Sequence, residues 1–322
     1  MIAAVIRAGA LELVERPTPE PAGDQVLVEV AGTGVNRADL LQLRGHYPAP
    51  PGWPADVPGL EFSGRVAAVG SRVHSLSAGD EVFGIVGGGG HASHVLVPES
   101  LCARVPRGLD LVEAGGVPEV FVTAHDALVT QAGLRAGERV LIHGAGSGVG
   151  TAAVQIAHAL GATTIGTART PEKLERVKEL GLDEAVLAAP DMAAEIGEVD
   201  VVIDLIGGDY LRTDVKVSRY QGRIVIVGLL AGPAAELDMR RLMSKRLTVT
   251  GTTLRMRAEW QKAQATARFE REVVPLFERG ALRPVIDRLV PIAQITTAYQ
   301  ALERNETFGK LVLFFSTPVS RG

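Results

Sequence analysis

The spacing of hydrophobic and polar positions changes near residue 121. Before that point, short apolar or alternating runs, such as residues 26–30, 64–69 and 92–97, are separated by Pro and Gly. Runs of this length and spacing predict short strands, so we expect a β-rich domain. The four consecutive glycines at 87–90 predict a flexible loop within it.

From about residue 122, apolar strands alternate with helical patterns. The expected strands are residues 139–143, 163–168, 184–187, 199–206, 223–229 and 247–254. This alternation predicts right-handed crossovers and a parallel sheet covered by helices on both faces. Thr170 followed by Pro171 predicts the start of one helix, and Leu180 followed by Gly181 predicts its end.

The last part of the chain mixes both patterns and can return to the first domain. We expect a helix over 258–279 interrupted near Pro275, a strand at 289–292, an amphipathic helix at 294–303 and an apolar strand at 310–315. The sequence therefore predicts one domain made of residues 1–121 and 265–322, and a second made of residues 122–264.

The turn between the first strand and helix of the second domain carries the strongest chemical signal. Strand 139–143 runs directly into Gly-Ala-Gly-Ser-Gly-Val-Gly at 144–150 and then into a helix over 151–160. Small residues let backbone amides approach phosphates, and the helix directs its free donors and positive dipole end at them. The predicted contacts of a dinucleotide pyrophosphate are Gly146, Ser147, Gly148, Val149 and Gly150. The alternative is a tight strand-to-helix turn without a ligand.

Composition excludes several classes of protein. The 322 residues are 46% hydrophobic and 22% charged, and no apolar run reaches the ~18 to 20 residues of a membrane-spanning helix. No secretory signal is recognisable, and Cys102 is the only cysteine, so we expect a cytoplasmic protein without internal disulfides. A net charge of −4 argues against nucleic acid as a partner.

An ordered set of motifs resembles one known family. These motifs are Asn-Arg-Ala-Asp at 36–39, Gly-His-Tyr-Pro at 45–48, the segments 58–64 and 78–84, and the glycine turn. They resemble the zinc-free, zeta-crystallin-type NADPH quinone oxidoreductases of the medium-chain dehydrogenase/reductase superfamily, most closely the p53-inducible branch. The resemblance implies an α/β protein: a GroES-like β-rich catalytic domain plus a Rossmann domain with a doubly wound parallel sheet.

Metal binding is tested by counting possible ligands. Zinc members of the superfamily carry a cysteine at the position of Asn36, a histidine at that of Leu60 and a four-cysteine lobe, all lacking here. A catalytic zinc needs about three protein ligands. His91 and His94 would point to opposite faces if 92–97 is a strand. We therefore expect no metal site.

The end of the second strand of the Rossmann domain indicates the cofactor. An NAD site usually has an acidic side chain there, whereas this chain has Arg169 and, one turn into the next helix, Lys173. Two cations and a helix N-terminus favour the 2'-phosphate of NADPH. The resemblance implies that Lys173 is the phosphate-binding lysine, although the family's tyrosine after the third strand has no counterpart near 187–189. The alternative is that both cations are ordinary surface charges.

Hydride transfer requires mainly that nicotinamide and acceptor meet in a dry cleft, which we expect between the domains. The resemblance places Asn36, Tyr47 and Thr123 near nicotinamide and substrate, and Gly228 and Leu229 beneath the nicotinamide ribose. Asn36 offers an amide to a substrate carbonyl or a ribose hydroxyl. Tyr47 offers a hydrogen bond, a proton or an aromatic face.

Structural roles compete with these assignments. Tyr47 can be a loop anchor, and Thr123 a helix N-cap. We interpret Glu61 as a buried partner of a backbone amide or an arginine, and Cys102 as a small core residue, because no nearby base activates it.

The predicted function is NADPH-dependent reduction of quinones or related conjugated carbonyls without zinc. The alternatives are an enoyl or alkenal double-bond reductase and, in another class, an NADPH-binding structural or regulatory protein. Strand 247–253 is expected at the edge of its sheet, where an unpaired ladder invites pairing, so we also expect a homodimer.

Overall fold

The computed structural model describes residues 1–315 and divides into two units. The first contains residues 1–119, 255–280 and the described chain from 286 onward, and the second contains residues 120–254 and 281–285. The predicted boundary at 264 was therefore wrong and lies at 254. The physical reason is Arg255, whose guanidinium donates to Gly87 O and Tyr47 O within the first unit.

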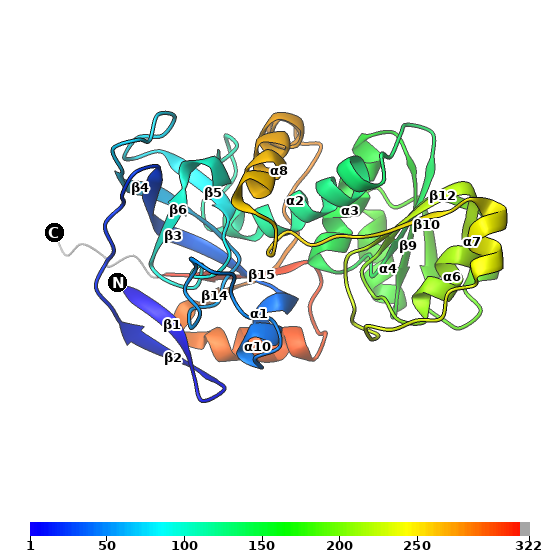
Figure 1. Cartoon of the computed structure of the whole chain (residues 1–322), viewed down its shortest axis with the longest axis horizontal. Helices are drawn as coiled ribbons and strands as arrows, with labels where there is room; N and C mark the ends of the chain where they lie inside the picture. The colour runs from blue at the N-terminus through cyan, green and yellow to red at the C-terminus, as the bar shows by residue number, and fades with distance from the viewer. Residues whose placement is uncertain (316–322) are drawn as a thin grey trace. The chain divides into compact units, whose positions relative to one another are not determined.

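Within the described chain, the first unit contains a seven-stranded sheet with β3 (Gln25–Val35) near its centre (Figure 1). Antiparallel partners of β3 are β4 (Glu61–Val69), β6 (His94–Pro98) and β15 (Lys310–Phe314). The sheet continues through β5 (Glu81–Ile85) and β7 (Cys102–Arg104) on one side and β14 (Ile286–Pro291) on the other. A separate hairpin is formed by β1 (Ile2–Arg7) and β2 (Ala10–Glu15).

Four helices accompany this sheet. They are α1 (Arg37–Leu43), α8 (Glu259–Glu272), α9 (Val274–Glu278) and α10 (Ile295–Glu303). The helical pattern that we expected to be interrupted near Pro275 is indeed split into α8 and α9, because proline fits only the first turn of a helix. Pairing of β15 with β3 brings the end of the described chain into the sheet formed by its beginning.

Two predictions for the segment after β5 were wrong. Gly87, Gly88, Gly89 and Gly90 are buried, not a flexible loop. His91 lies before β6, so the argument from alternating strand faces does not apply to it. His91 is completely buried, where its Nε2 donates to Gly34 O at 3.3 Å and its Nδ1 accepts from the Tyr299 hydroxyl at 3.1 Å. Burial lowers its pKa.

The second unit contains a six-stranded parallel sheet in the order β10-β9-β8-β11-β12-β13 (Figure 1). The strands are β8 (Arg139–His143), β9 (Thr163–Ala168), β10 (Glu184–Leu187), β11 (Val199–Asp204), β12 (Ser218–Ile226) and β13 (Thr248–Gly251). This is the doubly wound order of a Rossmann domain, and it confirms the predicted fold class. β13 lies at one edge, paired with β12.

Helices between these strands pack on the sheet. They are α3 (Gly148–Ala159), α4 (Pro171–Lys178), α5 (Ala193–Ile196), α6 (Tyr210–Val217) and α7 (Met239–Lys245), preceded by α2 (Pro118–His125), which crosses the unit boundary. Thr170 is the N-cap of α4 with Pro171 in its first turn, as predicted. In the described part of the chain, no helix is both long and apolar enough to cross a bilayer.

Candidate functional site

The glycine turn joins β8 to α3 in the second unit. Ser147 is the N-cap of α3, and its hydroxyl accepts a hydrogen bond from the Gly150 amide at 3.1 Å. A Cβ atom on Gly150 would lie 2.3 Å from Gly144 O, so only glycine permits this close packing of helix and turn. The amides of Gly148 and Val149 have no acceptor within residues 1–315. These two amides can therefore hold an anion.

This geometry changes the predicted roles within the turn. Gly150 donates to Ser147, so its amide is already satisfied and it acts through packing. Gly146 is buried, whereas Ser147 is exposed and Gly148 and Val149 are half-buried. Of the five residues predicted to contact a pyrophosphate, Gly146, Gly148 and Val149 have amides without an acceptor within residues 1–315.

The two cationic residues that follow β9 lie at the end of that strand and in the first turn of α4, as the sequence predicted. Arg169 directly follows the strand and is exposed, and Lys173 is half-buried in the first turn of α4. No acidic residue occurs from Thr163 to Pro171, although Glu172 stands exposed in the same turn. The local charge at the end of β9 is positive.

Two loops lie beyond β11 and β12. The Asp204 carboxylate accepts from the amides of Ile206 and Gly207 at 2.8 and 2.9 Å, and its carbonyl accepts from Val227 and Gly228. Asp204 therefore connects the loop after β11 to the segment after β12. Gly228 is half-buried and Leu229 is 56% exposed, so Leu229 is accessible to a ligand.

A buried acid–base cluster that the sequence analysis did not identify joins His143 at the end of β8, Asp204 at the end of β11 and Asp214 within α6. His143 Nε2 is 2.9 Å from Asp214 Oδ1 and Nδ1 is 2.8 Å from the Thr167 hydroxyl, and both titratable side chains are inaccessible. Burial lowers the pKa of His143 to about 4 and raises the pKa of Asp214 well above its usual value. Burial and Asp214 raise the pKa of Asp204 to about 6. The available signal was a histidine at the end of β8 and an aspartate at the end of β11, whereas nothing local marked Asp214 in α6.

A second buried cluster in the first unit surrounds Asn36. Lys310, only 4% exposed, donates to Asn36 Oδ1 and approaches Glu61 Oε1, both at 2.7 Å, and donates to Val35 O at 3.1 Å. Glu61 Oε2 accepts from the Glu119 amide at 2.8 Å. Glu61 is thus the buried structural partner that we expected, with a lysine in place of an arginine.

This network limits what Asn36 can do. Its amide nitrogen donates to Glu61 Oε1 at 2.9 Å and to Gly34 O at 3.3 Å, which uses both hydrogens. The remaining capacity is a lone pair on Oδ1. Asn36 can therefore accept from a hydroxyl group, such as a ribose hydroxyl, but in this arrangement it has no hydrogen for a substrate carbonyl.

Glu119 adds an unusual carboxyl group beside this cluster. Burial and the neighbouring Glu61 raise the pKa of Glu119 to about 8, although Lys310 acts in the opposite direction. The carboxyl is therefore largely protonated at neutral pH and can hold a proton.

Tyr47 is held by Arg255, a residue that the sequence analysis missed. Arg255 donates to Tyr47 O at 2.8 Å, and its guanidinium carbon lies 4.9 Å from the centre of the Tyr47 ring. Arg255 also donates to Gln42 Oε1 at 2.5 Å. The anchoring role considered for Tyr47 is therefore real, and its side chain remains half-buried.

The remaining predicted residues differ in their surroundings. Thr123 lies in the interior of α2 and is half-buried, so the alternative of a helix N-cap was wrong. Asn36 and Tyr47 belong to the first unit and Thr123 to the second. Cys102 is buried, which raises the pKa of its thiol, consistent with a core residue. Residues 1–315 contain no group of three or more His, Cys, Asp or Glu side chains placed to hold a metal ion.

Comparisons with known proteins identify two family domains. The alcohol dehydrogenase GroES-like domain matches residues 22–107, and the zinc-binding dehydrogenase domain matches residues 148–268. A quinone oxidoreductase of Lama guanicoe is 34% identical over 306 residues, covering 92% of this chain and 90% of the relative. The polyketide synthase protein NorB of Streptomyces orinoci is 36% identical over 318 residues, covering 94% of this chain but 14% of NorB.

Solved structures agree with this relationship. An alcohol dehydrogenase superfamily protein from Novosphingobium aromaticivorans has a TM-score of 0.88 and 33% identity, covering 98% of this chain and all of its own. The CurK enoyl reductase has a TM-score of 0.85 and 27% identity, with coverage of 98% and 99%. A mycobacterial protein complexed with NADPH has a TM-score of 0.86 and 26% identity, with coverage of 98% and 100%.

The fold, the order of strands and these matches lead to one conclusion. The chain belongs to the zeta-crystallin-like quinone oxidoreductase family of the medium-chain dehydrogenase/reductase superfamily, whose members are oxidoreductases that bind a nicotinamide cofactor.

Proposed function

We propose that this protein is an NADPH-dependent quinone oxidoreductase that transfers hydride without a metal ion. Its similarity to quinone oxidoreductases extends over nearly the whole length of both chains and supports the quinone as acceptor. The observation that carries the choice of cofactor is the positive, carboxylate-free end of β9.

Binding of NADPH involves two parts of the second unit. The amides of Gly148 and Val149 at the start of α3 fit a pyrophosphate, and the tight packing at Gly150 holds the turn that presents them. Arg169 and Lys173 offer cations to the 2'-phosphate, where an acidic residue would repel it. Gly228 and Leu229 contact the nicotinamide ribose in this proposal.

When bound, the nicotinamide supplies a hydride to the quinone, and a proton completes the hydroquinone. Asn36 Oδ1, oriented by Lys310, accepts from a hydroxyl of the cofactor and helps to position it. Tyr47 offers its ring face to a planar acceptor and its hydroxyl as a donor. Thr123 contributes a hydroxyl near the reacting groups.

The proposal of a metal-free reaction rests on the ammonium group beside Asn36. Lys310 Nζ lies 2.7 Å from both Asn36 Oδ1 and Glu61 Oε1, so a fixed positive charge already occupies the surroundings of these two oxygens. A divalent cation at the same oxygens would be repelled by that charge. The side chains around Asn36 therefore favour a lysine-organised site.

An enoyl reductase is the second candidate. It is favoured by the similarity to the polyketide synthase protein NorB and by the structural likeness to the CurK enoyl reductase. Both reactions need hydride transfer to a conjugated system, and they differ in whether the acceptor is a quinone or an α,β-unsaturated carbonyl or thioester.

A homodimer is part of the proposal. β13 lies at the edge of the six-stranded sheet, and its outer ladder can pair with the same strand of a second copy. Sedimentation at micromolar concentration tests this, and a monomer would contradict it.

The decisive experiment measures NADPH oxidation with a panel of quinones, enones and enoyl thioesters. We expect saturable turnover of quinones and little turnover of the other two classes. Turnover of enones or enoyl thioesters without quinones would establish the second candidate. Tight binding of NADPH with no turnover of any acceptor would indicate a structural or regulatory protein.

A further inference from the structure

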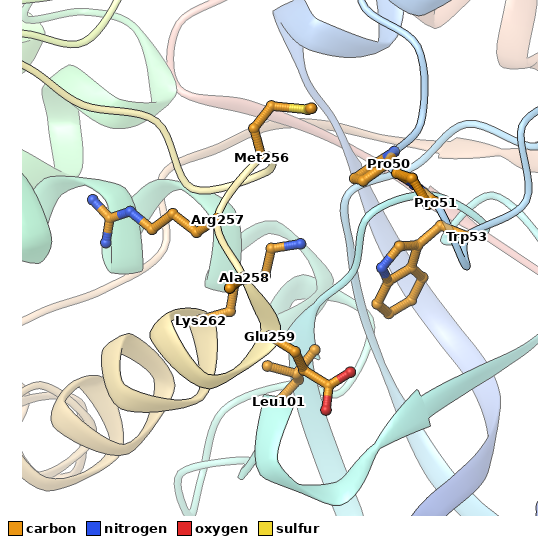
Figure 2. A pocket seen from close by; sticks show the side chains of 9 residues that line it. All are labelled: Pro50, Pro51, Trp53, Leu101, Met256, Arg257, Ala258, Glu259 and Lys262. Carbon is orange, nitrogen blue, oxygen red and sulfur yellow. The ribbon is translucent and has the colours of Figure 1, made fainter.

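A cavity of about 390 Å³ lies in the first unit, between the loop after Tyr47 and the start of α8 (Figure 2). Its walls include Pro50 and Trp53 on one side, and Met256 and Lys262 on the other. A volume of this order is typical of pockets for small organic ligands. None of these residues has a role in the proposed handling of NADPH.

Lys262 is the most informative residue of the cavity. It lies near the start of α8 and is only 4% exposed, yet its ammonium group makes no hydrogen bond or ion pair with any of residues 1–315. Burial lowers its pKa, partly offset by Glu119 and Glu259. An ammonium group on so deeply buried a side chain loses much of its hydration, and an anionic ligand would compensate for that loss.

Trp53 provides an aromatic surface beside this amine. Lys262 Nζ lies 5.8 Å from the centre of the Trp53 ring, within the range of a cation–π contact. A Cβ atom on Gly87 would lie 2.5 Å from Trp53 Cδ1, so the buried glycine gives the indole its place. The ring is half-buried, and Figure 2 shows it at the cavity wall across from Lys262.

The start of α8 adds to the positive character of the cavity. Ala258 is the N-cap, and the amides of Glu259 and Trp260 have no acceptor among the described residues. Free amides and the helix dipole favour an anion here. Arg257 also lines the cavity, whereas the exposed Glu259 carboxylate opposes an anion.

We propose that this cavity binds a planar aromatic ring carrying a carboxylate or sulfonate group, with the ring beside Trp53 and the anion on Lys262. The identity of this ligand rests on the proposed function: the ligand is the electron acceptor. The preferred quinones therefore carry an anionic substituent. Arg255 directly precedes the cavity residue Met256 and donates to the Tyr47 carbonyl, so the same short segment of chain borders the cavity and holds Tyr47.

Binding is tested with naphthalene-2-sulfonate, which is not reduced, by calorimetry on the whole protein. Lys262→Met should raise its Kd about 10- to 100-fold, because a hydrogen bond to a charged group is lost. Trp53→Leu should raise it about 3- to 10-fold. Lys216→Met, at an exposed lysine of the second unit, is the matched control and should bind like the wild type. Unchanged binding by Lys262→Met, or no binding by the wild type, overturns the proposal.

Glu259→Gln gives a second, opposite test. Removing this carboxylate should lower the Kd of naphthalene-2-sulfonate about 2- to 5-fold, since an exposed charge contributes little. A weaker affinity would contradict an anion in the cavity. Because neither the Lys262 nor the Glu259 side chain makes a hydrogen bond or ion pair within residues 1–315, we expect both variants to fold, and far-UV circular dichroism checks this.

Kinetics separates failure of the cavity from failure of the quinone reductase proposal. The ratio of kcat/KM for 1,2-naphthoquinone-4-sulfonate to that for 1,2-naphthoquinone should fall about 10- to 100-fold in Lys262→Met. Turnover with an unchanged ratio would overturn the acceptor class and leave the quinone reductase in place. Lys262-dependent binding of naphthalene-2-sulfonate without turnover of either quinone would support the cavity and overturn the reductase.

Discussion

Replacing Lys310 by methionine should destabilise the first unit strongly. Lys310 is 4% exposed, and its ammonium group has three acceptors at 2.7 to 3.1 Å, one of them the completely buried Glu61 carboxylate. Methionine keeps most of the stem but leaves Glu61 as a buried charge without its cation. Breaking a buried pair in this way costs about 3 to 5 kcal/mol. That is a large fraction of the ~5 to 15 kcal/mol by which domains are stable.

The free energy of unfolding is measured by urea denaturation at pH 7. Trp53 and Trp260 are the only tryptophans, and both belong to the first unit, so their fluorescence follows that unit alone. Circular dichroism follows the whole chain and shows whether the second unit unfolds separately, which matters because two units need not unfold in one step.

A double variant supplies the control. Lys310→Met with Glu61→Gln removes both charges, so it should be less destabilised than Lys310→Met alone, because no isolated charge remains. A cost below about 1 kcal/mol for Lys310→Met, or a double variant as unstable as the sum of the two single variants, would refute the reasoning.

Three further predictions concern other parts of the molecule. Lys173→Ala should raise the Kd of NADPH about 10-fold or more and leave that of NADH nearly unchanged in fluorescence titrations, and equal effects would remove the phosphate assignment. Gly150→Ala should cost about 1 to 3 kcal/mol in thermal or urea unfolding, because the new Cβ meets Gly144 O at 2.3 Å. Gly251→Ala is the control for an added methyl group, because a Cβ there meets no atom within 4 Å and its backbone is not in the positive-φ region. The pKa of Glu119, raised from 4.5 to about 8, means that the folded state binds the extra proton, so stability should fall as pH rises between these values, by roughly 1.4 kcal/mol per pH unit at most. Glu119→Gln should flatten that part of the curve relative to the wild type, and parallel curves would contradict the raised pKa.

Local pattern alone was enough to predict several elements. Strand β9 occupies the predicted residues 163–168, and Thr170 with Pro171 starts α4 as expected. The strand-to-helix turn at 144–150 was predicted for the same reason. In each case neighbours in the sequence supply the deciding energies: apolar runs bounded by glycine, and a capping residue before a proline.

Other features depended on contacts between residues far apart in the sequence. Lys310 begins an apolar strand, and only the pairing of β15 with β3 brings it to Asn36, 274 residues away. Gly87 to Gly90 were expected to be flexible because glycine is, yet Trp53 and Gly59 pack against them. Even within the glycine turn, composition could not show that Ser147 satisfies the Gly150 amide.

The sequence by itself determined the two kinds of domain, the glycine-rich turn between β8 and α3 and the cations after β9, because periodicity, capping and charge act over a few residues. The tertiary structure alone decided which buried titratable groups meet, namely Lys310 with Glu61 and His143 with Asp214, and that the Lys262 ammonium group has no ion-pair partner among residues 1–315. The physical reason is that burying a charged group costs free energy unless an opposite charge or a hydrogen-bond partner lies within a few ångström of it. The order of residues along the chain does not fix that distance before the sheets have formed.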